Sequence, residues 1–400
     1  MPLPHARFFV FPGPIHAQEM YDVVIVGAGP AGTAAARRCA GYGLNTLLVE
    51  EHAAVGYPVQ CAGLLSRAAV QECGVSPAAI VREVSSASVI SSAGSVLDFD
   101  AGVTKALVVN RGILDREMAQ RAADEGAEIR LKTYAYGVGD GVLRTKGVRG
   151  TEDVRYRLLI AADGPRSPLS RLLGMKRPPV FLSGIQAEVP YAMDGRHVQI
   201  YPDASPDFFG YAIPVEEGRA RVGLCGQSDV SARFASFSAR FGGSCMHLVT
   251  GTIPLGQMPR SYGQRTLFVG DAAGLAKPTS GGGVYTGVRS GYHAADTAVE
   301  CCENDVFSDA ALSSYEQRWK DDFGRELDLG MRFFTLRPMI TPDLVDEVCR
   351  ALNTPEMKDL IVRYGDIDRP GDVLKHLLKH PVMFRVIRSI VTSELWRIIK

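Results

Sequence analysis

The chain has 400 residues, a mass of 43.2 kDa and a formal net charge of zero, since 44 Lys and Arg balance 44 Asp and Glu. This length exceeds one compact core and predicts two or three packed units. Hydrophobic residues at 46% and charged residues at 22% exclude a disordered or fibrous chain. The balanced charge argues against a nucleic acid partner, and no apolar run approaches the roughly 20 residues that span a bilayer.

Residues 1–19 match neither a folded element nor a signal peptide. Pro12 and Pro14 break their apolar stretch, and Arg7 is their only Lys or Arg. The first predicted strand begins at Tyr21, directly after Met20. We therefore expect translation to start at Met20 and residues 1–19 to be a disordered extension, which an intact mass including residue 1 would contradict.

The eight cysteines form no dense framework and contain no C-x-x-C pair, so the sequence predicts neither a zinc ribbon nor a thioredoxin-type motif. We expect no metal site. Most of the thiols should be buried small hydrophobes in a protein of the reducing cytoplasm.

The strongest local signal is a predicted nucleotide site at the start of the chain. The apolar, β-branched run Val23–Val26 is typical of a strand buried on both faces. Gly27 would allow a tight turn, Gly29 would let the backbone approach a pyrophosphate, and Gly32 would let helix and strand pack closely. The small-residue helix predicted over Thr33–Ala40 would then offer its N-terminus to the phosphates.

A second strand, predicted over Thr46–Val49, ends at Glu50, 18 residues beyond Gly32. A carboxylate at this position can accept hydrogen bonds from a ribose 2′-hydroxyl and would repel a 2′-phosphate. The alternative is a surface carboxylate beside Glu51.

Two later segments indicate which dinucleotide binds. Residues 158–167 form a buried strand followed by an acidic turn at Asp163, and residues 266–274 form another with Asp271. A further glycine-rich segment, residues 278–284, opens a helix. The flavin and ribityl parts of FAD need such additional carboxylates and backbone donors, whereas NAD does not, so we expect FAD as the cofactor.

These segments resemble three FAD fingerprints of the flavoproteins built like p-hydroxybenzoate hydroxylase: GAGPAG, AADGPRS and VGDAAG…SGGGV. Within that group, Gly56–Leu64 (GYPVQCAGL) is similar to the cysteine-containing flavin loop of the geranylgeranyl reductase family, which includes archaeal digeranylgeranylglycerophospholipid reductases. The resemblance covers roughly residues 20–300. It implies an α/β fold, with a Rossmann-type FAD-binding domain, an inserted antiparallel β-sheet substrate domain and a helical C-terminal region.

The resemblance also implies cofactor contacts. At the adenosine end, the pyrophosphate would contact Gly27, Gly29, Ala31 and Gly32, and the ribose would contact Glu50. At the flavin end, Asp271 would bind the ribityl hydroxyls, Asp163 would lie nearby, and the pyrimidine edge would face Gly283 and Val284. Arg111 would brace FAD, and the flavin face would be covered by Cys61, Ala62 and Gly63. Some of these have structural alternatives. Asp163 and Asp271 could be helix N-caps, and Arg111 a solvated charge at a helix start.

Cys61 is the first candidate catalytic residue. It stands in a loop with Pro58 and Gly63, and the family's matching loop runs over the flavin face. It would orient substrate, tune the flavin or donate a proton; a thiol with an ordinary pKa of about 8.5 is mostly protonated at neutral pH. The alternative is a buried core cysteine.

Short alternating strands are predicted between the fingerprints, including a hairpin of Phe208–Pro214 and Arg219–Leu224 around a turn at residues 216–218. Phe209, Tyr211 and Ile213 would share one face and either line a substrate cavity or form ordinary core. Tyr211 is the second catalytic candidate, as an aromatic that stabilises positive charge. The family typically has aromatic-x-Trp-x-Phe-Pro here, and this chain lacks the tryptophan, which bears on substrate chain length and head group.

Domain limits follow from these segments. We expect a discontinuous FAD-binding domain over residues 20–85, 104–178 and 256–304, a substrate domain over 86–103 and 179–255, and a helical region over 305–400. The last segment, residues 381–400, is amphipathic and basic, and would either lie on anionic lipid or pack on the FAD domain.

The resemblance implies an FAD-dependent reductase that saturates isolated isoprenoid double bonds of archaeal-type membrane lipids or their precursors. The reduced electron donor is left open among ferredoxin, a deazaflavin and NADPH. The alternatives are an aromatic monooxygenase on the same scaffold and a membrane-docked electron carrier. We expect a cytoplasmic location, including the inner face of the cell membrane.

Overall fold

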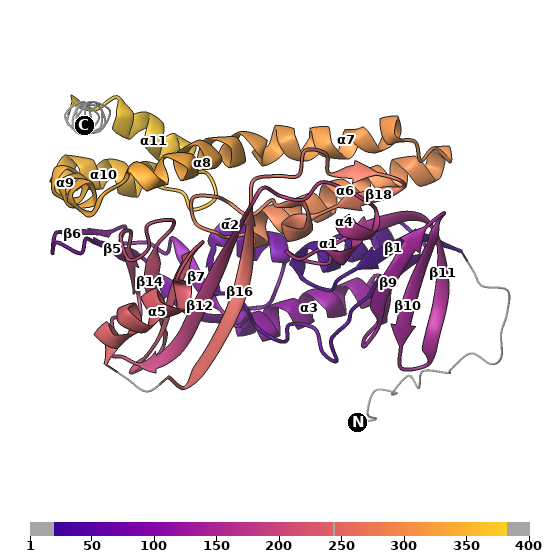
Figure 1. The fold of residues 1–400 in the computed structure, drawn as a ribbon, viewed down its shortest axis with the longest axis horizontal. Helices are drawn as coiled ribbons and strands as arrows, with labels where there is room; N and C mark the ends of the chain where they lie inside the picture. Colours follow the sequence, from indigo (N-terminus) through magenta and orange to yellow (C-terminus); the bar gives the residue numbers. More distant parts are fainter. Residues whose placement is uncertain (1–19, 243–244, 382–400) are drawn as a thin grey trace, which may run out of the picture.

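The computed structural model describes residues 20–242 and 245–381 (Figure 1). The predictions for residues 1–19 and for the amphipathic segment 382–400 therefore lie outside the described residues. Within the described ranges, no helix has the length and hydropathy that crossing a bilayer requires.

The first sheet has a parallel centre. Strand β1 (Tyr21–Val26) pairs in parallel with β2 (Thr46–Val49) on one side and with β11 (Gly150–Ala161) on the other. The sheet order is β17-β18-β11-β1-β2-β8, and β9 and β10 form an antiparallel extension on β11. The remaining strands of this sheet are β8 (Glu128–Arg130), β9 (Tyr134–Gly139), β10 (Val142–Gly147), β17 (Tyr262–Gly263) and β18 (Thr266–Phe268).

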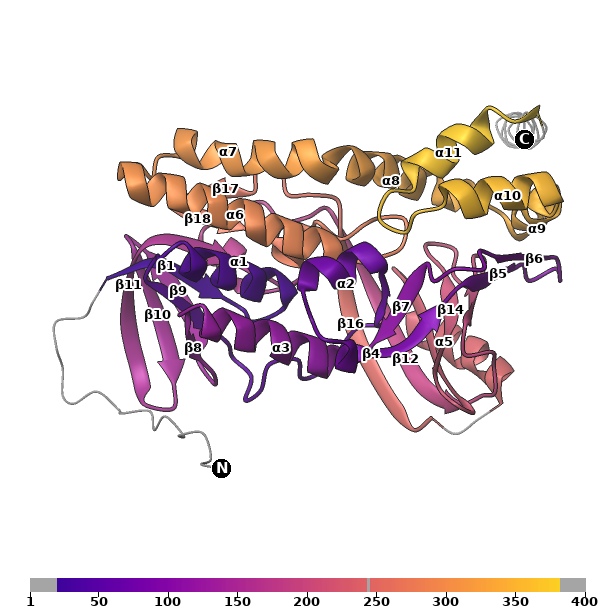
Figure 2. The same ribbon diagram turned by 180° about the vertical axis from the view of Figure 1, so that it is seen from behind.

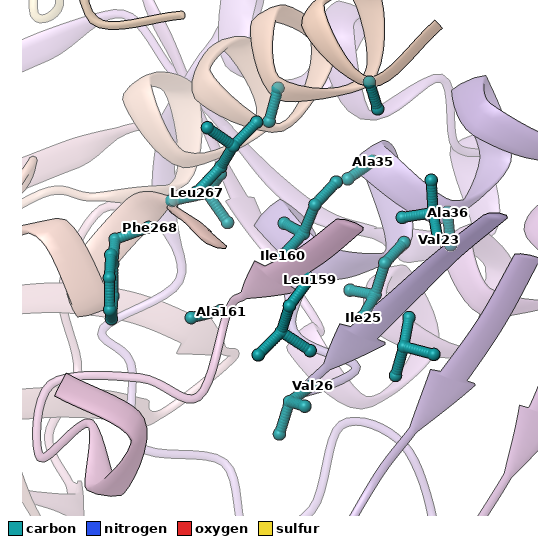
Figure 3. Packing of buried hydrophobic residues seen from close by; sticks show 14 of the residues in the cluster. Val23, Ile25, Val26, Ala35, Ala36, Leu159, Ile160, Ala161, Leu267 and Phe268 are labelled. Carbon is teal, nitrogen blue, oxygen red and sulfur yellow. The ribbon is translucent and has the colours of Figure 1, made fainter. Parts of the chain in front are cut away.

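The main core lies between this sheet and helix α1 (Pro30–Gly41). Figure 3 shows Val23 and Ile25 of β1 beside Ile160 of β11, with Ala35 and Ala36 of α1 close by. Their side chains are fully buried, because both faces of the parallel strands are covered. The strand-turn-helix-strand unit predicted from residues 23–50 is confirmed.

The second sheet is mostly antiparallel and has seven strands in the order β16-β12-β15-β14-β13-β5-β6. Its strands are β5 (Ser86–Ile90), β6 (Val96–Asp100), β12 (Val180–Pro190), β13 (His197–Tyr201), β14 (Gly210–Glu216), β15 (Arg219–Gly226) and β16 (His247–Leu255). Helix α5 (Val230–Ser238) covers one face through Phe234 and Phe237. The predicted hairpin is present as β14 and β15.

A small third sheet, β3-β7-β4, lies between the two large sheets. It consists of β3 (Leu64–Ser66), β4 (Ile80–Val84) and β7 (Ala106–Val109). Along the chain, helix α2 (Arg67–Cys73) follows β3, and helix α3 (Arg111–Asp124) follows β7. Strand β3 directly follows the cysteine loop, so this sheet fixes the position at which that loop ends.

Long helices run along one side of both large sheets (Figures 1 and 2). They are α6 (Val284–Asn304), α7 (Asp309–Trp319), α8 (Arg325–Leu336), α9 (Pro342–Leu352), α10 (Pro355–Tyr364) and α11 (Gly371–Leu378), with the short α4 (Pro168–Leu172) elsewhere. Within the region predicted to be helical, α7 and α8 are joined by a π-helical turn. Helices α9 and α10 pack on β6, which links the helical region to the second sheet. The domain boundaries themselves stay a prediction.

Candidate functional site

The glycine turn between β1 and α1 has the geometry of an anion site. Gly27 has φ +103°, and a Cβ there would lie 2.2 Å from the Ala162 carbonyl oxygen. A Cβ on Gly32 would lie 1.9 Å from the Gly27 oxygen, so both positions require glycine. Gly29, the N-cap of α1, has open space beside it and no side chain caps the helix. The free N–H groups of α1 therefore point toward a space that can hold phosphate.

That space is a large cavity of about 1210 Å³. Its walls include Gly27, Gly29, Glu50, Cys61, Asp163 and Asp271. The cavity thus brings together predicted site residues that are up to 244 positions apart in the sequence, from Gly27 to Asp271. Arg111 lines both this cavity and a smaller one of about 280 Å³ behind the cysteine loop.

Glu50 is buried and is not a free surface carboxylate. One carboxylate oxygen accepts a hydrogen bond from the Ala28 amide (2.7 Å), and the other accepts from the amide of His52 (2.9 Å). The oxygen bonded to the His52 amide also lies 2.6 Å from Nδ1 of the His52 ring, whereas among the described residues the other oxygen has only the Ala28 amide. Glu50 can therefore hold the glycine turn and still accept from a ribose hydroxyl through that second oxygen.

Asp163 and Asp271 both face the cavity, but their surroundings differ. The Asp163 carboxylate accepts hydrogen bonds from the Ser167 hydroxyl (2.8 Å) and the Leu169 amide (3.0 Å). It therefore orders the start of α4, as the helix-capping alternative predicts. Burial raises the pKa of Asp163 to about 6, although these hydrogen bonds act in the opposite direction.

Among the described residues, no donor hydrogen-bonds the Asp271 side chain, and burial raises its pKa to about 6 against the opposing charge of Arg111. A Cβ on Gly283, the N-cap of α6, would lie 2.6 Å from the Asp271 carboxylate, and Val284 begins that helix. A partly buried carboxylate on a cavity wall beside an uncapped helix N-terminus is placed to accept donors from a ligand, because unpaired burial is costly.

The amide of Ala31 belongs to the uncapped start of α1, so its place at the pyrophosphate stays a prediction, while its side chain and carbonyl have packing contacts. Ala31 does not line either cavity and packs in the crossing of α1 and α6, where a Cβ on Gly291 would lie 2.4 Å from its carbonyl oxygen. Ala31 thereby sets how closely α6 approaches the glycine turn.

Arg111 is the first residue of α3 and is not a solvated charge. Its guanidinium forms two hydrogen bonds of 2.8 Å with the Asp115 carboxylate and contacts the Cys61 thiol. Burial opposes the charge, but Asp115 and Cys61 raise the pKa of Arg111 above its usual value. No pattern in the sequence indicates the contact between Arg111 and Cys61.

The cysteine loop lies across the cavity wall. Cys61 is partly accessible, and its sulfur accepts a hydrogen bond of 3.4 Å from the Gly63 amide. Gly63 has φ +75°, and a Cβ there would lie 2.6 Å from the Val109 carbonyl oxygen. Ala62 packs its side chain on the core between the third sheet and β14.

Tyr211 lies behind this loop rather than on a cavity wall. It packs with Ile213 in the core cluster that contains Ala62, and neither described cavity is lined by it. Phe209 joins a separate cluster with Phe208, at a ring distance of 4.5 Å. This placement favours the core alternative for the aromatic face of β14. Burial raises the pKa of the Tyr211 hydroxyl well above its ordinary value.

Sequence reasoning missed three residues that hold the loop and its neighbours. Gln186 donates to the Cys61 carbonyl, Arg221 donates to the Ala62 carbonyl, and buried Lys277 lies under Gly282. For Gln186 and Arg221, the only signal in the sequence was the alternation of polar residues along β12 and β15, which is also the pattern of a sheet that faces solvent. Lys277 lies outside both strands and had no such signal.

The cavity fits FAD on the evidence of its own walls. Its wall offers both the uncapped N–H groups of α1 and the Asp271 carboxylate, which has no donor among the described residues, so a molecule that carries phosphates and hydroxyls satisfies both. Within residues 20–242 and 245–381, no cluster of side chains could hold a metal ion.

Comparison with known proteins agrees with this geometry. The profile of the FAD binding domain family matches residues 20–232. Digeranylgeranylglycerophospholipid reductase 1 of Methanopyrus kandleri is 30% identical, over 87% of this chain and 98% of that protein. Digeranylgeranylglycerophospholipid reductase 2 of Methanothermobacter thermautotrophicus is 29% identical, over 93% of this chain and 100% of that protein.

Solved structures give the same picture. A geranylgeranyl bacteriochlorophyll reductase-like protein of Thermoplasma acidophilum superposes with a TM-score of 0.80 and 26% identity, covering 90% of this chain and 98% of its own. The p-nitrophenol 4-monooxygenase of Pseudomonas putida shares the fold alone, with a TM-score of 0.70 and 18% identity over 86% of this chain and 97% of its own.

Proposed function

The chain belongs to the FAD binding domain family and, within it, to the digeranylgeranylglycerophospholipid reductases, and we propose that it saturates isolated isoprenoid double bonds of archaeal-type membrane lipids or their precursors. FAD is its cofactor and the enzyme is an oxidoreductase acting on carbon–carbon double bonds. An isoprenoid lipid is the substrate.

One observation carries this proposal. The cysteine loop, whose sequence distinguishes the family from the hydroxylases of the same fold, borders the cavity that also contains the glycine turn and Asp271. A thiol beside the cofactor has an evident use in reducing an alkene, which needs a proton as well as a hydride.

The proposed cofactor contacts follow from the cavity walls. Gly27, Gly29 and Gly32 would shape the pyrophosphate site at α1, and Glu50 would accept from the ribose. Asp271 would accept from ribityl hydroxyls, with Gly283 and Val284 at the adjoining helix N-terminus. We assign Asp163 to ordering α4 beside the cofactor, and the Ala31 amide to the pyrophosphate together with the glycine turn.

The chemistry divides between cofactor and chain. Reduced FAD, when bound, supplies a hydride to one alkene carbon. An isolated alkene has no carbonyl to accept charge, so the protein must deliver a proton to the other carbon, and Cys61 is positioned on the wall to do this. Arg111 contacts the thiol and would hold it in place.

The test is anaerobic. The holoprotein is reduced with dithionite and given a geranylgeranyl-glycerol phospholipid, and the products are read by mass spectrometry. We expect a mass gain of two hydrogen atoms for each bond reduced. Fully reduced flavin without a gain would contradict the proposal, and oxygen consumption coupled to NADPH would indicate the monooxygenase alternative.

The electron donor is identified by a second experiment. Ferredoxin, a reduced deazaflavin and NADPH are each mixed with the oxidised holoprotein without oxygen, and bleaching of the flavin absorbance is followed. We propose that the physiological donor is the one whose reduction rate exceeds the rate of lipid turnover, since a slower donor could not sustain catalysis.

We also propose that the protein works at the cytoplasmic face of the membrane, because its substrate is a membrane lipid. Residues 381–400 are the segment proposed for peripheral contact. Their removal should abolish sedimentation with anionic liposomes while the holoprotein keeps its flavin spectrum; unchanged sedimentation would contradict this role.

A further inference from the structure

Each carbonyl of the cysteine loop is held by a different element. The Cys61 carbonyl accepts a hydrogen bond from the Gln186 side chain on β12 (3.1 Å), and the Ala62 carbonyl accepts one from Arg221 on β15 (2.5 Å). The Gly63 carbonyl accepts from the Val109 amide on β7 (2.8 Å). Three consecutive carbonyls are thus fixed from the second and third sheets, which leaves the loop little freedom.

Gln186 also binds in the opposite direction. Its side-chain oxygen accepts a hydrogen bond from the Tyr211 hydroxyl (2.8 Å). Gln186 and Tyr211 lie on β12 and β14, and both are paired with Gly223 on β15 between them. A Cβ on Gly223 would lie 2.2 Å from Cζ of Tyr211, so the glycine provides the space through which the phenol reaches Gln186.

These two bonds give the buried amide one orientation, with its oxygen toward Tyr211 and its nitrogen toward the loop. The hydroxyl proton of Tyr211 is engaged by Gln186, and Tyr211 lines neither cavity. Tyr211 therefore cannot donate that proton to a substrate without first breaking a buried hydrogen bond.

We propose that Gln186 is a positioning residue that transmits the fixed orientation of Tyr211 to the backbone of Cys61, so that Tyr211 acts through Gln186 and Cys61 alone meets the substrate. The proposal rests on the reductase function for its catalytic consequence. Its structural part, the fixing of the loop by Gln186, stands independently of the reaction.

The first test replaces Gln186→Leu, which removes both hydrogen bonds at similar volume. Amide hydrogen exchange at Gly63 and Val109 is measured by mass spectrometry, in apoprotein and holoprotein, and we expect it to accelerate by about fivefold or more. Lipid turnover should show kcat about tenfold lower or more with KM nearly unchanged, because the reacting group is misplaced while binding is kept.

The chain offers a matched control. Gln199 accepts a hydrogen bond of 2.8 Å from Tyr201 in the same sheet without contacting the cysteine loop. Gln199→Leu should therefore change neither the exchange of Gly63 and Val109 nor kcat. Unchanged exchange in Gln186→Leu, or equal acceleration in both variants, would overturn the proposal.

Two further variants separate positioning from a general packing role. For Gln186→Glu, the quantity to follow is the ratio of its kcat to the wild-type kcat at each pH. This ratio should rise as the pH is lowered, since a neutral carboxyl can donate to the Cys61 carbonyl and accept from Tyr211. Taking the ratio removes the titration of the groups nearby, namely Glu188, Arg221, His247, Tyr211 and Cys61. A flat ratio would contradict the assigned role of the amide.

Tyr211→Phe keeps the bond between Gln186 and Cys61, so it should lower kcat less than Gln186→Leu does. A larger loss in Tyr211→Phe would show that the tyrosine acts on substrate directly and would overturn the proposal. If wild type reduces no lipid but Gln186→Leu still accelerates exchange at the loop, the reductase assignment fails and the loop assignment stands.

Discussion

Cys61 and Arg111 form a contact that ties the thiol to a guanidinium already paired with Asp115. Substituting Cys61→Ser keeps the loop backbone and its hydrogen bonds but removes the thiol. We expect FAD to remain bound, judged by the flavin absorbance, and lipid reduction to fall by about 100-fold, the usual contribution of a positioned proton donor. Cys245→Ser, at an exposed position, is the control. Turnover that survives in Cys61→Ser would remove this residue from the mechanism.

Asp271 gives a prediction about pH and stability. Its folded-state pKa of about 6 lies above the value of an unfolded aspartate, so its contribution to apoprotein stability is present at low pH and is lost as the pH rises through 6. At pH 8 the neutral Asp271→Asn apoprotein should therefore be more stable than wild type, by at most about 3 kcal/mol and less where water reaches the carboxylate.

The same variant should bind FAD more weakly, since the ribityl hydroxyls lose a charged acceptor. Thermal unfolding of apoprotein and holoprotein at pH 5 and pH 8 measures both effects, and exposed Asp153→Asn is the control. Equal unfolding temperatures for the wild-type and Asp271→Asn apoproteins at pH 8 would contradict the burial penalty.

For single residues, the sequence pattern predicted which side chains line the cavity but not the role of each. Asp163 and Asp271 both follow a buried strand, and the glycines around Asp271 favour a ligand contact over a helix cap without showing which groups surround either carboxylate. The difference arises because the chain after Asp163 turns back and presents the Ser167 hydroxyl and the Leu169 amide. Such a turn depends on the packing of α4, which is beyond local pattern.

The crossing of helices α1 and α6 sets how closely α6 approaches the glycine turn of the anion site. Gly291→Ala would place a Cβ against the Ala31 backbone and push α6 away from the glycine turn. We expect a loss of about 1–3 kcal/mol in the free energy of unfolding, together with weaker FAD binding.

Gly41→Ala is the matched control, because a Cβ at the end of α1 meets only ordinary contacts at 3.6 Å. Denaturant unfolding and FAD titration measure the two effects. If Gly291→Ala behaved like Gly41→Ala, the close approach of the two helices would not limit the site.

The strands show why the interior face of the second sheet was not recognised. Polar residues alternate along β12, and this alternation is typical of a sheet with one face in water. Here Gln186 and Glu188 instead face the FAD-binding part of the molecule, where they contact the cysteine loop and Arg221. The positions of the strands and the hairpin were predictable from the residues, whereas the register of β12 and the partner of its polar face were not.

For the molecule as a whole, a buried ion pair joins the helical region to the rest. Lys277 contacts the Asp368 carboxylate, which also accepts from the Ser66 hydroxyl, and both charged residues are nearly inaccessible. Asp368→Ala would leave Lys277 buried without its partner and should cost about 3–5 kcal/mol of folding free energy.

The double variant Lys277→Met with Asp368→Leu should recover most of that loss, since apolar residues of similar volume replace the pair. Chemical denaturation with flavin fluorescence as a second probe measures both. A single variant as stable as wild type would show that the helical region is held by its apolar contacts alone.

The helical region was predictable as helices, but its attachment was not. Leu352 and Met357 pack on Leu97 of β6 through a contact between segments more than 250 residues apart. Periodicity identifies the apolar face of each helix and carries no information on which surface covers it.

The order of the strands along the chain has a consequence for protein synthesis. Strand β1 is made first, yet its sheet is complete only when β18 arrives, about 240 residues later, and Asp271 and α6 follow it. A chain halted after β16 therefore contains the glycine turn and the cysteine loop but still lacks Asp271 of the cavity wall and strand β18 of the first sheet. Such long-range pairing delays folding and exposes apolar strands to aggregation. Chains halted at residue 255 should retain no FAD when isolated, and retention would show that the first half of the molecule captures its cofactor while translation continues.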